Sequence, residues 1–512
     1  MKTNTVPSRL GLSKLFLVVS ALAVIMLGPS RNASAQEGLK TFTGRFDDGA
    51  TYLIEVPEKW NGTLFLYSHG YLPPGTLNPP ADNGDLLVRL FLLSHNYALA
   101  GSSYASTGWA IHEALRDQIA VLDTFNSTVG HPTRTIAWGH SLGGIISAGL
   151  VQDDPDRFAG AVPLCGVLAG GVGLWNEFLD SAFAFNTLLA SGGLQVVNIT
   201  DPTTNLNNAQ QFLSYAQATA QGQARIALTA ALVDSSGWID PFSPQPNPKD
   251  YATLEANQFA SLQGFPFQLF FALRAELEER AGGNASWNTD VDYEKQLKRS
   301  IDYAEVQALY KKAGLSLDAD VKALNSAKRI AADHGAVSYL SQNISFNGDI
   351  KVPVLTVHTT GDDIVSVQNE QAYAAVVHAA HNDSLLRQTF VHRAGHCNFT
   401  SAETIAALQA LIHRLDTGEW EGFEPEDLNE TASDLARVYN FLFIGAPAPS
   451  PSSFVHYTPA PFLRRSILLI KRTGANSDAL YWVPAAQSRA RWQHKKMMEQ
   501  KSDQQRVGLV AR

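Results

Sequence analysis

The sequence of 512 residues is poor in cysteine, with two residues, and in charged side chains, which make up 17% of it. Two cysteines exclude a disulfide-dense scaffold and a zinc site built from four thiolates. The 38 Gly and 24 Pro residues are at the ordinary background, which excludes collagen-like and low-complexity chains. An excess of basic residues is also lacking, because the net charge is −9, and this argues against a nucleic-acid partner.

A hydrophobic run of membrane-spanning length is lacking as well. The apolar stretch near the start, residues 15–27, has 13 residues, which is too few to cross a bilayer. It follows basic residues and precedes Ala33-Ser34-Ala35, a small-residue cleavage site. These features predict a signal peptide over residues 1–35, with a short membrane anchor as the alternative. We therefore expect a secreted protein, extracellular or periplasmic, whose mature chain begins near Gln36 and contains no transmembrane segment.

The last fifty residues differ in composition from the rest. Residues 464–512 carry eleven Lys or Arg against three acidic side chains, whereas the preceding chain is strongly acidic. Such a segment buries little apolar surface, so we expect a disordered basic tail over 464–512. A basic anchor for anionic surfaces is the alternative interpretation.

Between these ends, apolar runs alternate with helical spacing up to about residue 166. The order predicts parallel βαβ units, a sheet covered on both faces, and an α/β fold. The alternation stops over residues 167–349, which contain mainly helical patterns, and we expect this insertion to form a lid beside the site. Strand character returns at 352–359 and 386–392. The expected strands are 63–68, 97–102, 133–139, 160–165 and a short pair within 41–56; the expected helices include 85–94, 109–125, 142–152, 267–280, 291–309, 319–332 and 402–415.

One segment carries a strong chemical signal. An apolar strand runs into Gly139-His140-Ser141-Leu142-Gly143 and then into a helical pattern. In this Gly-x-Ser-x-Gly context the serine occupies a tight strand-to-helix turn that exposes its hydroxyl, and Gly139 and Gly143 leave room for the close approach of strand and helix. Ser141 is therefore the candidate nucleophile.

A serine nucleophile needs a base and an orienting carboxylate, which follow it in the chain in this arrangement. The candidate acid is Asp362, just after the strand at 352–359, with its neighbour Asp363 as the rival. We favour Asp362 because an apolar residue, Val365, follows three positions later. The candidate base is His396, preceded by Gly395; His392 competes but falls inside the expected strand.

The negative charge that develops during acyl transfer needs two backbone N–H donors. Leu142, directly after the serine, supplies one candidate, and Tyr71, directly after His69-Gly70, supplies the other. The chemistry requires no cofactor. His378 and His381 have a spacing that a metal site can use, but no third ligand matches them, and we predict no metal.

Ser141, Asp362 and His396, together with the His69-Gly70 turn, resemble the α/β-hydrolase superfamily over residues 36–166 and 350–416. The resemblance implies a mostly parallel eight-stranded sheet with helices on both faces. It assigns residues 36–166 and 350–463 to a catalytic core, with a large, mainly helical lid at 167–349 inserted after the strand that follows the nucleophile helix. It also implies a two-step mechanism through an acyl-enzyme, which water hydrolyses. The lid matches no lid that defines a substrate.

In this superfamily the loops that carry Cys165 and Cys397 both lie at the carboxyl edge of the sheet, near the site. In an exported protein this placement suggests a disulfide that clamps the histidine loop, similar to the cysteine pair of tannase-type and fungal feruloyl esterases. There, however, one cysteine adjoins the serine. Two buried free thiols are an equally supported alternative.

The leading hypothesis is a secreted serine hydrolase that cleaves carboxylic esters. A serine aminopeptidase or amidase of the same fold is the second; it would need a lid carboxylate for the substrate amine, and the Glu-rich run at 276–279 looks more like an exposed helical face. A binding protein on an inactive scaffold is the third. The aromatic residues within 175–185 and 265–271 either line an acyl pocket or, as we favour, form the core of the lid.

Overall fold

The computed structural model describes residues 38–442 and 446–464. The predicted signal peptide at 1–35 and the predicted tail beyond Arg464 lie outside the described residues. Within the described residues, no helix combines the length and the apolar character that crossing a membrane requires.

One sheet organises the molecule, with strand order β1-β2-β4-β3-β5-β6-β7-β8-β9. The strands from β4 to β8 pair in parallel, and β1, β2 and β9 add antiparallel edges. This arrangement confirms the predicted mostly parallel α/β sheet; the described residues add a ninth strand, of two residues, to the eight expected. The strands are β1 (Lys40–Arg45), β2 (Thr51–Val56), β3 (Thr63–Ser68), β4 (Ala98–Ser102), β5 (Arg134–His140), β6 (Gly160–Leu164), β7 (Val354–Gly361), β8 (Leu386–Ala394) and β9 (Phe454–Val455).

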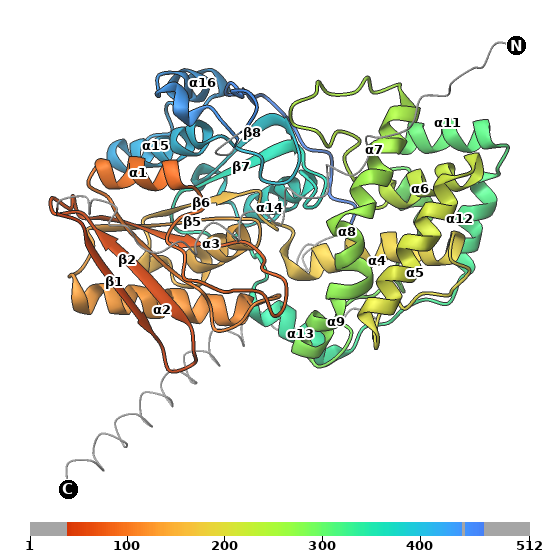
Figure 1. Ribbon diagram of the computed structural model, residues 1–512, viewed down its shortest axis with the longest axis horizontal. Helices are drawn as coiled ribbons and strands as arrows, with labels where there is room; N and C mark the ends of the chain where they lie inside the picture. Colours follow the sequence, from red (N-terminus) through yellow and green to blue (C-terminus); the bar gives the residue numbers. More distant parts are fainter. Residues whose placement is uncertain (1–37, 443–445, 465–512) are drawn as a thin grey trace, which may run out of the picture.

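Helices cover both faces of this sheet (Figure 1). Alternation along β3 explains why both faces are apolar: Leu64 and Leu66 belong to one core, and Phe65 and Tyr67 to the other. The face with Phe65 packs against α1 (Leu86–Ser94), α15 (Ser401–Thr417) and α16 (Pro425–Ser433), and the face with Leu64 packs against α2 (Ile111–Thr128), α3 (Leu142–Asp153) and α14 (Gln368–Ala379).

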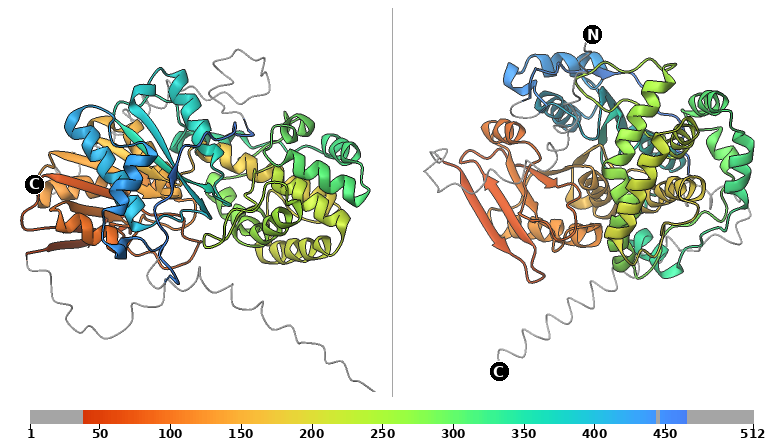
Figure 2. Two further views of the ribbon diagram at one scale, coloured as in Figure 1. Left: turned by 90° about the horizontal axis from the view of Figure 1, so that it is seen from above. Right: turned by 45° about the vertical axis from the view of Figure 1, so that its right-hand side comes forward.

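Residues 167–349 form a helical insertion beside the carboxyl edge of the sheet (Figure 2). Part of its core joins one of the two sheet cores, and a separate apolar cluster lies wholly within the insertion. Its helices are α4 (Gly170–Leu188), α5 (Pro202–Gln217), α6 (Ala220–Ala231), α7 (Tyr251–Gln263), α8 (Phe265–Gln268), α9 (Arg274–Ala281), α10 (Tyr293–Leu297), α11 (Tyr303–Ala313), α12 (Leu317–Ser326) and α13 (His334–Asn343).

Three helices expected in the insertion differ from the structure. The one expected at 267–280 contains a π-helical turn, Leu269–Leu273, between α8 and α9. The one expected at 291–309 is divided, because Asp234 accepts hydrogen bonds from the Ser300 hydroxyl and the Ile301 amide between α10 and α11. The one expected at 319–332 ends with α12 at Ser326, and the chain beyond it pairs with another loop through the Ile330 amide and the Asn288 side chain.

The last described residues connect the sheet to the insertion. Beyond β9, the carbonyl of Phe462 accepts a hydrogen bond from Arg299 at 2.7 Å, and Arg464 Nη1 lies 3.5 Å from Asp180 Oδ2 in α4. Arg464, which composition assigned to the basic tail, is therefore nearly buried and paired with an acidic side chain in the insertion.

Candidate active site

The backbone at Ser141 forms the sharp turn that the sequence predicts. Ser141 lies between β5 and α3 with φ 57° and ψ −117°, an uncommon conformation for a residue with a side chain. A Cβ atom added to Gly139 or to Gly143 would overlap the carbonyl oxygen of Ser68. The two glycines are thus required by the close contact of β5 and α3 with β3, and this contact holds the serine at the carboxyl edge of the sheet.

Three side chains from three loops meet at this edge. His396 Nε2 lies 2.8 Å from Ser141 Oγ, and His396 Nδ1 lies 2.6 Å from Asp362 Oδ2. Each residue follows a parallel strand, β5, β7 or β8, and the carboxyl ends of parallel strands meet at one edge. The three residues that the sequence separates by up to 255 positions therefore form one hydrogen-bonded chain.

The carboxylate of Asp362 is held in place on both oxygens. Its Oδ1 accepts hydrogen bonds from the amides of Ile364 and Val365, at 3.0 and 2.9 Å. Burial alone would raise the pKa of Asp362, but the charge of His396 and hydrogen bonds from His358 and His396 hold that pKa well below its usual range. The group is therefore ionised whenever the site is at neutral pH.

The two rivals considered from the sequence lie elsewhere. Asp363 has no hydrogen bond to His396 among those of the described residues, and it accepts one from the Ser261 hydroxyl of α7 at 3.0 Å. Burial, together with the charge of Asp362, raises the pKa of Asp363 to about 6. His392 is part of β8, and its ring packs on Trp238 with centroids 4.9 Å apart.

The candidate oxyanion donors border the serine. Leu142 is the first residue of α3, where the amide has no partner within the helix. A Cβ added to Gly70 would lie 3.5 Å from Ser141 Cβ, so the Gly70-Tyr71 peptide passes beside the nucleophile. The Tyr71 ring is partly buried and contacts Phe265 of the insertion, with centroids 6.1 Å apart.

A disulfide joins Cys165, directly after β6, to Cys397, directly after His396. The sequence left this bridge and two free thiols equally supported, and the bridge is formed. Both cysteines have positive φ, 44° and 57°, as does Ser141. Three strained backbone positions therefore lie together at the site, each at a cost of about 1–3 kcal/mol that the surrounding packing offsets.

A second histidine at the site, His358, was not predicted from the sequence; it lies on β7 with its side chain fully buried. Its Nδ1 lies 3.0 Å from Glu370 Oε1 in α14, and its Nε2 lies 3.4 Å from Asp362 Oδ2. The available signal was a histidine within the expected strand, four positions before the candidate acid. His140, next to the serine, is half-buried, and burial lowers its pKa to about 4.

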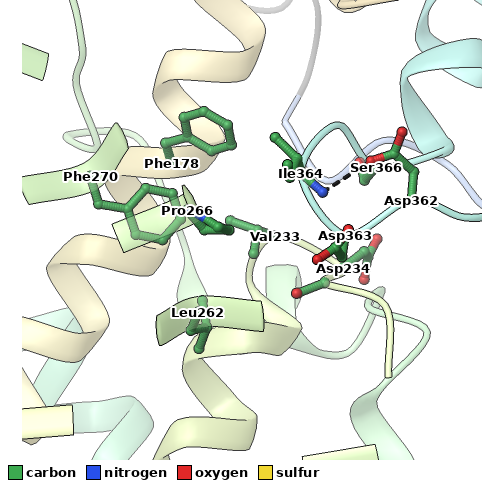
Figure 3. A pocket seen from close by; sticks show the side chains of 11 residues that line it. Phe178, Val233, Asp234, Leu262, Pro266, Phe270, Asp362, Asp363, Ile364 and Ser366 are labelled. Carbon is green, nitrogen blue, oxygen red and sulfur yellow. Dashed lines mark hydrogen bonds between the residues drawn. The ribbon is translucent and has the colours of Figure 1, made fainter. Parts of the chain in front are cut away.

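A cavity lies between the insertion and the loop of Asp362 (Figure 3). Phe178, Phe270 and Pro266 line one side of it, and the carboxyls of Asp234 and Asp363 lie on the other. Among the described residues, no hydrogen-bond partner is found for Asp234 Oδ2, Ser235 Oγ or Ser366 Oγ, which also border this space. The cavity therefore combines an apolar wall with polar groups that water or a ligand can satisfy.

The aromatic clusters of the insertion are mostly core, as favoured from the sequence. Phe185, Phe267 and Phe271 pack on one another, and only Phe178 and Phe270 of these clusters reach the cavity. The expectation of an exposed face at 276–279 was wrong: Glu278 is buried, and Glu276 accepts hydrogen bonds from the Trp109 amide at 3.0 Å and from Arg280 at 2.7 Å. This acidic segment attaches α9 to the core.

The potential metal ligands that lie together at the site include both cysteines of the disulfide. Among residues 38–442 and 446–464, one group of three potential ligands has its atoms within 4.8 Å of one another, Cys165, His396 and Cys397. Its two sulfurs are bonded to each other, so neither is a thiolate. His378 Nδ1 lies 2.8 Å from Asp383 Oδ1 on the surface.

Comparison with known proteins identifies a relative over most of the chain. No family model matches the sequence. The o-phthalyl amidase of Xanthobacter agilis is 34% identical over 421 residues, which cover 76% of this chain and 90% of the amidase. Among solved structures, feruloyl esterase B from Aspergillus oryzae has 14% identity and a TM-score of 0.40, covering 75% of this chain and 82% of the esterase. The acylaminoacyl peptidase of Pyrococcus horikoshii has 11% identity and a TM-score of 0.37, covering 77% of this chain and 44% of the peptidase.

Proposed function

The chain is a hydrolase of the α/β-hydrolase superfamily and belongs to the family of the o-phthalyl amidase of Xanthobacter agilis, and we propose that it is an exported serine hydrolase of carboxylic amides and esters. One observation carries the proposal: the hydrogen-bonded chain from Ser141 Oγ through His396 to Asp362, with distances of 2.8 and 2.6 Å. This is the arrangement that activates a serine hydroxyl.

In the proposed mechanism His396 Nε2 takes the hydroxyl proton as Ser141 Oγ attacks the substrate carbonyl carbon. The amides of Leu142 and Tyr71 stabilise the oxyanion, aided by the positive end of α3. His396 then donates the proton to the leaving amine or alcohol, which departs and leaves an acyl-enzyme. Water attacks the acyl group with His396 again as the base, and the acid is released with Ser141 restored.

Amide cleavage is the first candidate because the relative that matches over most of this chain is named as an amidase. The sequence by itself favoured esters, and ester cleavage is the second candidate. The two differ at the leaving group: an amine must be protonated before it departs, which makes general-acid catalysis by His396 more important than for an alcohol. An aromatic acyl group, such as the one in the relative's name, would suit Phe178 and Phe270, which line the cavity.

Residues 167–349 act as the lid in this proposal, over a core formed by 36–166 and 350–463. The support comes from direct contacts between the lid and the site loops. Ser261 donates a hydrogen bond to Asp363, beside the candidate acid, and Phe265 packs on Tyr71, beside the candidate oxyanion donor. A lid that touches both loops can exclude water and define the acyl pocket.

Export is supported by the disulfide between Cys165 and Cys397, because such bonds persist in oxidising compartments. It agrees with a signal peptide at 1–35 that is removed before Gln36. Expression of the whole chain followed by N-terminal sequencing of the material outside the cytoplasm tests this step. Protein retained in the cytoplasm with an intact N-terminus would contradict it.

The catalytic proposal is tested with a fluorophosphonate probe and with matched substrates. The probe should label the wild-type protein at Ser141 and fail to label Ser141→Ala, whose melting temperature should stay unchanged. An o-phthalyl arylamide and an aryl ester of the same acid then compare the two bonds at one acyl group. Labelling at another residue, or equal turnover by Ser141→Ala, would refute the serine mechanism. An alkylamide of the same acid is tested as well, because its bond is not activated by an aryl leaving group. A higher kcat/KM for the ester than for the arylamide would place ester cleavage first only if this alkylamide is not cleaved.

A further inference from the structure

The buried histidine of β7 links the candidate acid to a second buried carboxylate. His358 Nδ1 lies 3.0 Å from Glu370 Oε1. On its other side, Nε2 lies 2.9 Å from the carbonyl oxygen of Val365 and 3.4 Å from Asp362 Oδ2. The side chains of His358, Asp362 and Glu370 are all 0% exposed. The chain of contacts from Ser141 through His396 and Asp362 therefore continues to His358 and Glu370.

The partners of His358 determine where its protons are. A backbone carbonyl only accepts hydrogen bonds, so the contact with Val365 requires a proton on Nε2. Glu370 is held as an acceptor too, because its Oε2 receives hydrogen bonds from the Thr356 hydroxyl and the Gln388 amide, each at 2.5 Å. Because Oε2 already accepts two hydrogen bonds, we assign Oε1 as a further acceptor, which places a proton on Nδ1. Both ring nitrogens thus face acceptors, which only the imidazolium satisfies.

We propose that His358 is a positioning residue that remains an imidazolium throughout the reaction and keeps Asp362 ionised and oriented toward His396. The inference rests on the proposed function, since it takes Asp362 as the acid of the triad. Asp362 Oδ1 receives two backbone amides and Oδ2 receives His396. The charge of His358 beside Oδ2 therefore completes the surroundings of a carboxylate whose side chain is fully buried.

The charges of this hydrogen-bonded group of side chains balance when Ser141 gives its proton to His396. In the resting site, one imidazolium lies between two buried carboxylates, so the group carries one net negative charge. When Ser141 gives its proton to His396 Nε2, two imidazoliums face two carboxylates. The proton stops at His396, and none moves to Asp362 or His358. The carboxylate that stabilises His396 is thus already partly neutralised, which limits how strongly the base holds its proton and helps it return that proton to the leaving group.

The electrostatic environment of His358 agrees with this geometry. Burial alone would lower the pKa of His358, but its hydrogen bonds to Asp362 and Glu370 raise it to about 10. The titratable groups that interact with this hydrogen-bonded chain include His140 and Asp363 near His396, and Tyr373 near Glu370. Burial raises the pKa of Tyr373 well above its usual value, so this phenol stays neutral and does not change the balance.

The test replaces His358 by glutamine and compares pH profiles. In His358→Gln we expect kcat to fall about tenfold with KM within about twofold, because positioning rather than substrate contact is lost. The acid limb of kcat/KM should move to higher pH by about one unit, because a positive charge that opposes protonation of the base is removed. The matched control is His378→Gln, which removes a histidine paired with Asp383 at 2.8 Å but 79% exposed, on the same helix as Glu370. It should leave both quantities unchanged.

A second measurement needs no variant. Neutron diffraction from deuterated wild-type crystals at pH 8 should show deuterium on both ring nitrogens of His358. A single ring deuteron, or a His358→Gln variant that loses thermal stability but keeps the wild-type kcat and acid limb, would overturn the proposal. The proposed function has a separate test. If the fluorophosphonate still labels Ser141→Ala, Ser141 is not the nucleophile, whatever the result for His358.

Discussion

The disulfide between Cys165 and Cys397 joins residues 232 positions apart, and replacing both by alanine should destabilise the protein strongly. A cross-link that closes so long a loop restricts the unfolded chain by about 5 kcal/mol at 25 °C in the chain-entropy description. For a folded body of roughly 420 residues, an unfolding entropy near 2.1 cal/mol/K per residue gives about 0.9 kcal/mol per degree. The expected fall in melting temperature is therefore about 6 °C, measured by differential scanning calorimetry.

Activity should change much less, because other bonds hold the loop that carries His396. The Gly395 amide donates to the Gly361 carbonyl at 2.8 Å, and the Thr359 hydroxyl donates to the Gly395 carbonyl at 2.8 Å. The Asn398 side chain closes the loop on the Ala394 carbonyl, also at 2.8 Å. With these contacts intact, we expect kcat to fall by less than about tenfold, as a modest loosening of the base implies.

Two outcomes would refute this reasoning. An unchanged melting temperature in the double variant would contradict the argument from the unfolded chain. A loss of kcat of about a thousandfold with a normal melting temperature would mean that the bridge, rather than the hydrogen bonds, positions His396. Cys165→Ala alone is the matched control, because it breaks the same bond and should lower the melting temperature as far as the double variant does.

Two further predictions concern the carboxyls near the site. Asp362→Asn should lower kcat about 10⁴-fold because the amide stabilises the wrong tautomer of His396. Asp363→Asn should keep kcat within about threefold. Steady-state kinetics on one substrate compares the two variants, and the reverse order of their kcat values would identify Asp363 as the acid. Burial raises the pKa of Asp234 from 3.8 to about 7, so the folded state favours the protonated acid. This carboxyl has no effect on unfolding below about pH 4 and destabilises the folded state increasingly as the pH rises toward 7. Asp234→Asn should therefore be more stable than wild type by about 2–4 kcal/mol at pH 8 and equal to it at pH 4 in urea unfolding, and an equal gain at both pH values would contradict the linkage.

The sheet and the three candidate catalytic residues could be predicted because each depends on a local pattern. The strand at 63–68 is bounded as predicted, and the turn at Ser141 is dictated by Gly139 and Gly143. His396 and Asp362 could be placed beside Ser141 without any knowledge of packing, because the carboxyl ends of parallel strands share an edge. Local chemistry and topology were sufficient for this part.

The helix ends in the insertion could not be predicted from the sequence, because long-range hydrogen bonds determine where these helices end. Asp234 separates α10 from α11 through Ser300 and Ile301, more than sixty positions away. The sequence of 291–309 is helical in its spacing and contains no sign of that partner. Glu370 was missed for the same reason: its pairing with His358 depends on how α14 packs against β7.

Asp362 and Asp363 illustrate how far a sequence argument can go. The two residues have the same side chain and adjacent positions, so intrinsic acidity cannot separate them. The structure gives them opposite surroundings: Asp362 receives two amides and two imidazoles, while Asp363 receives one hydroxyl from the lid and the repulsion of its neighbour. Burial raises the pKa of Asp363 to about 6, whereas the pKa of Asp362 falls below its usual range although Asp362 is the less exposed of the two. In the proposed mechanism Asp362 must stay charged while His396 gains a proton, and the two amides and two imidazoles around Asp362 favour that charge. His358 supplies one of these imidazoles and lies on β7, the strand that ends directly before Asp362.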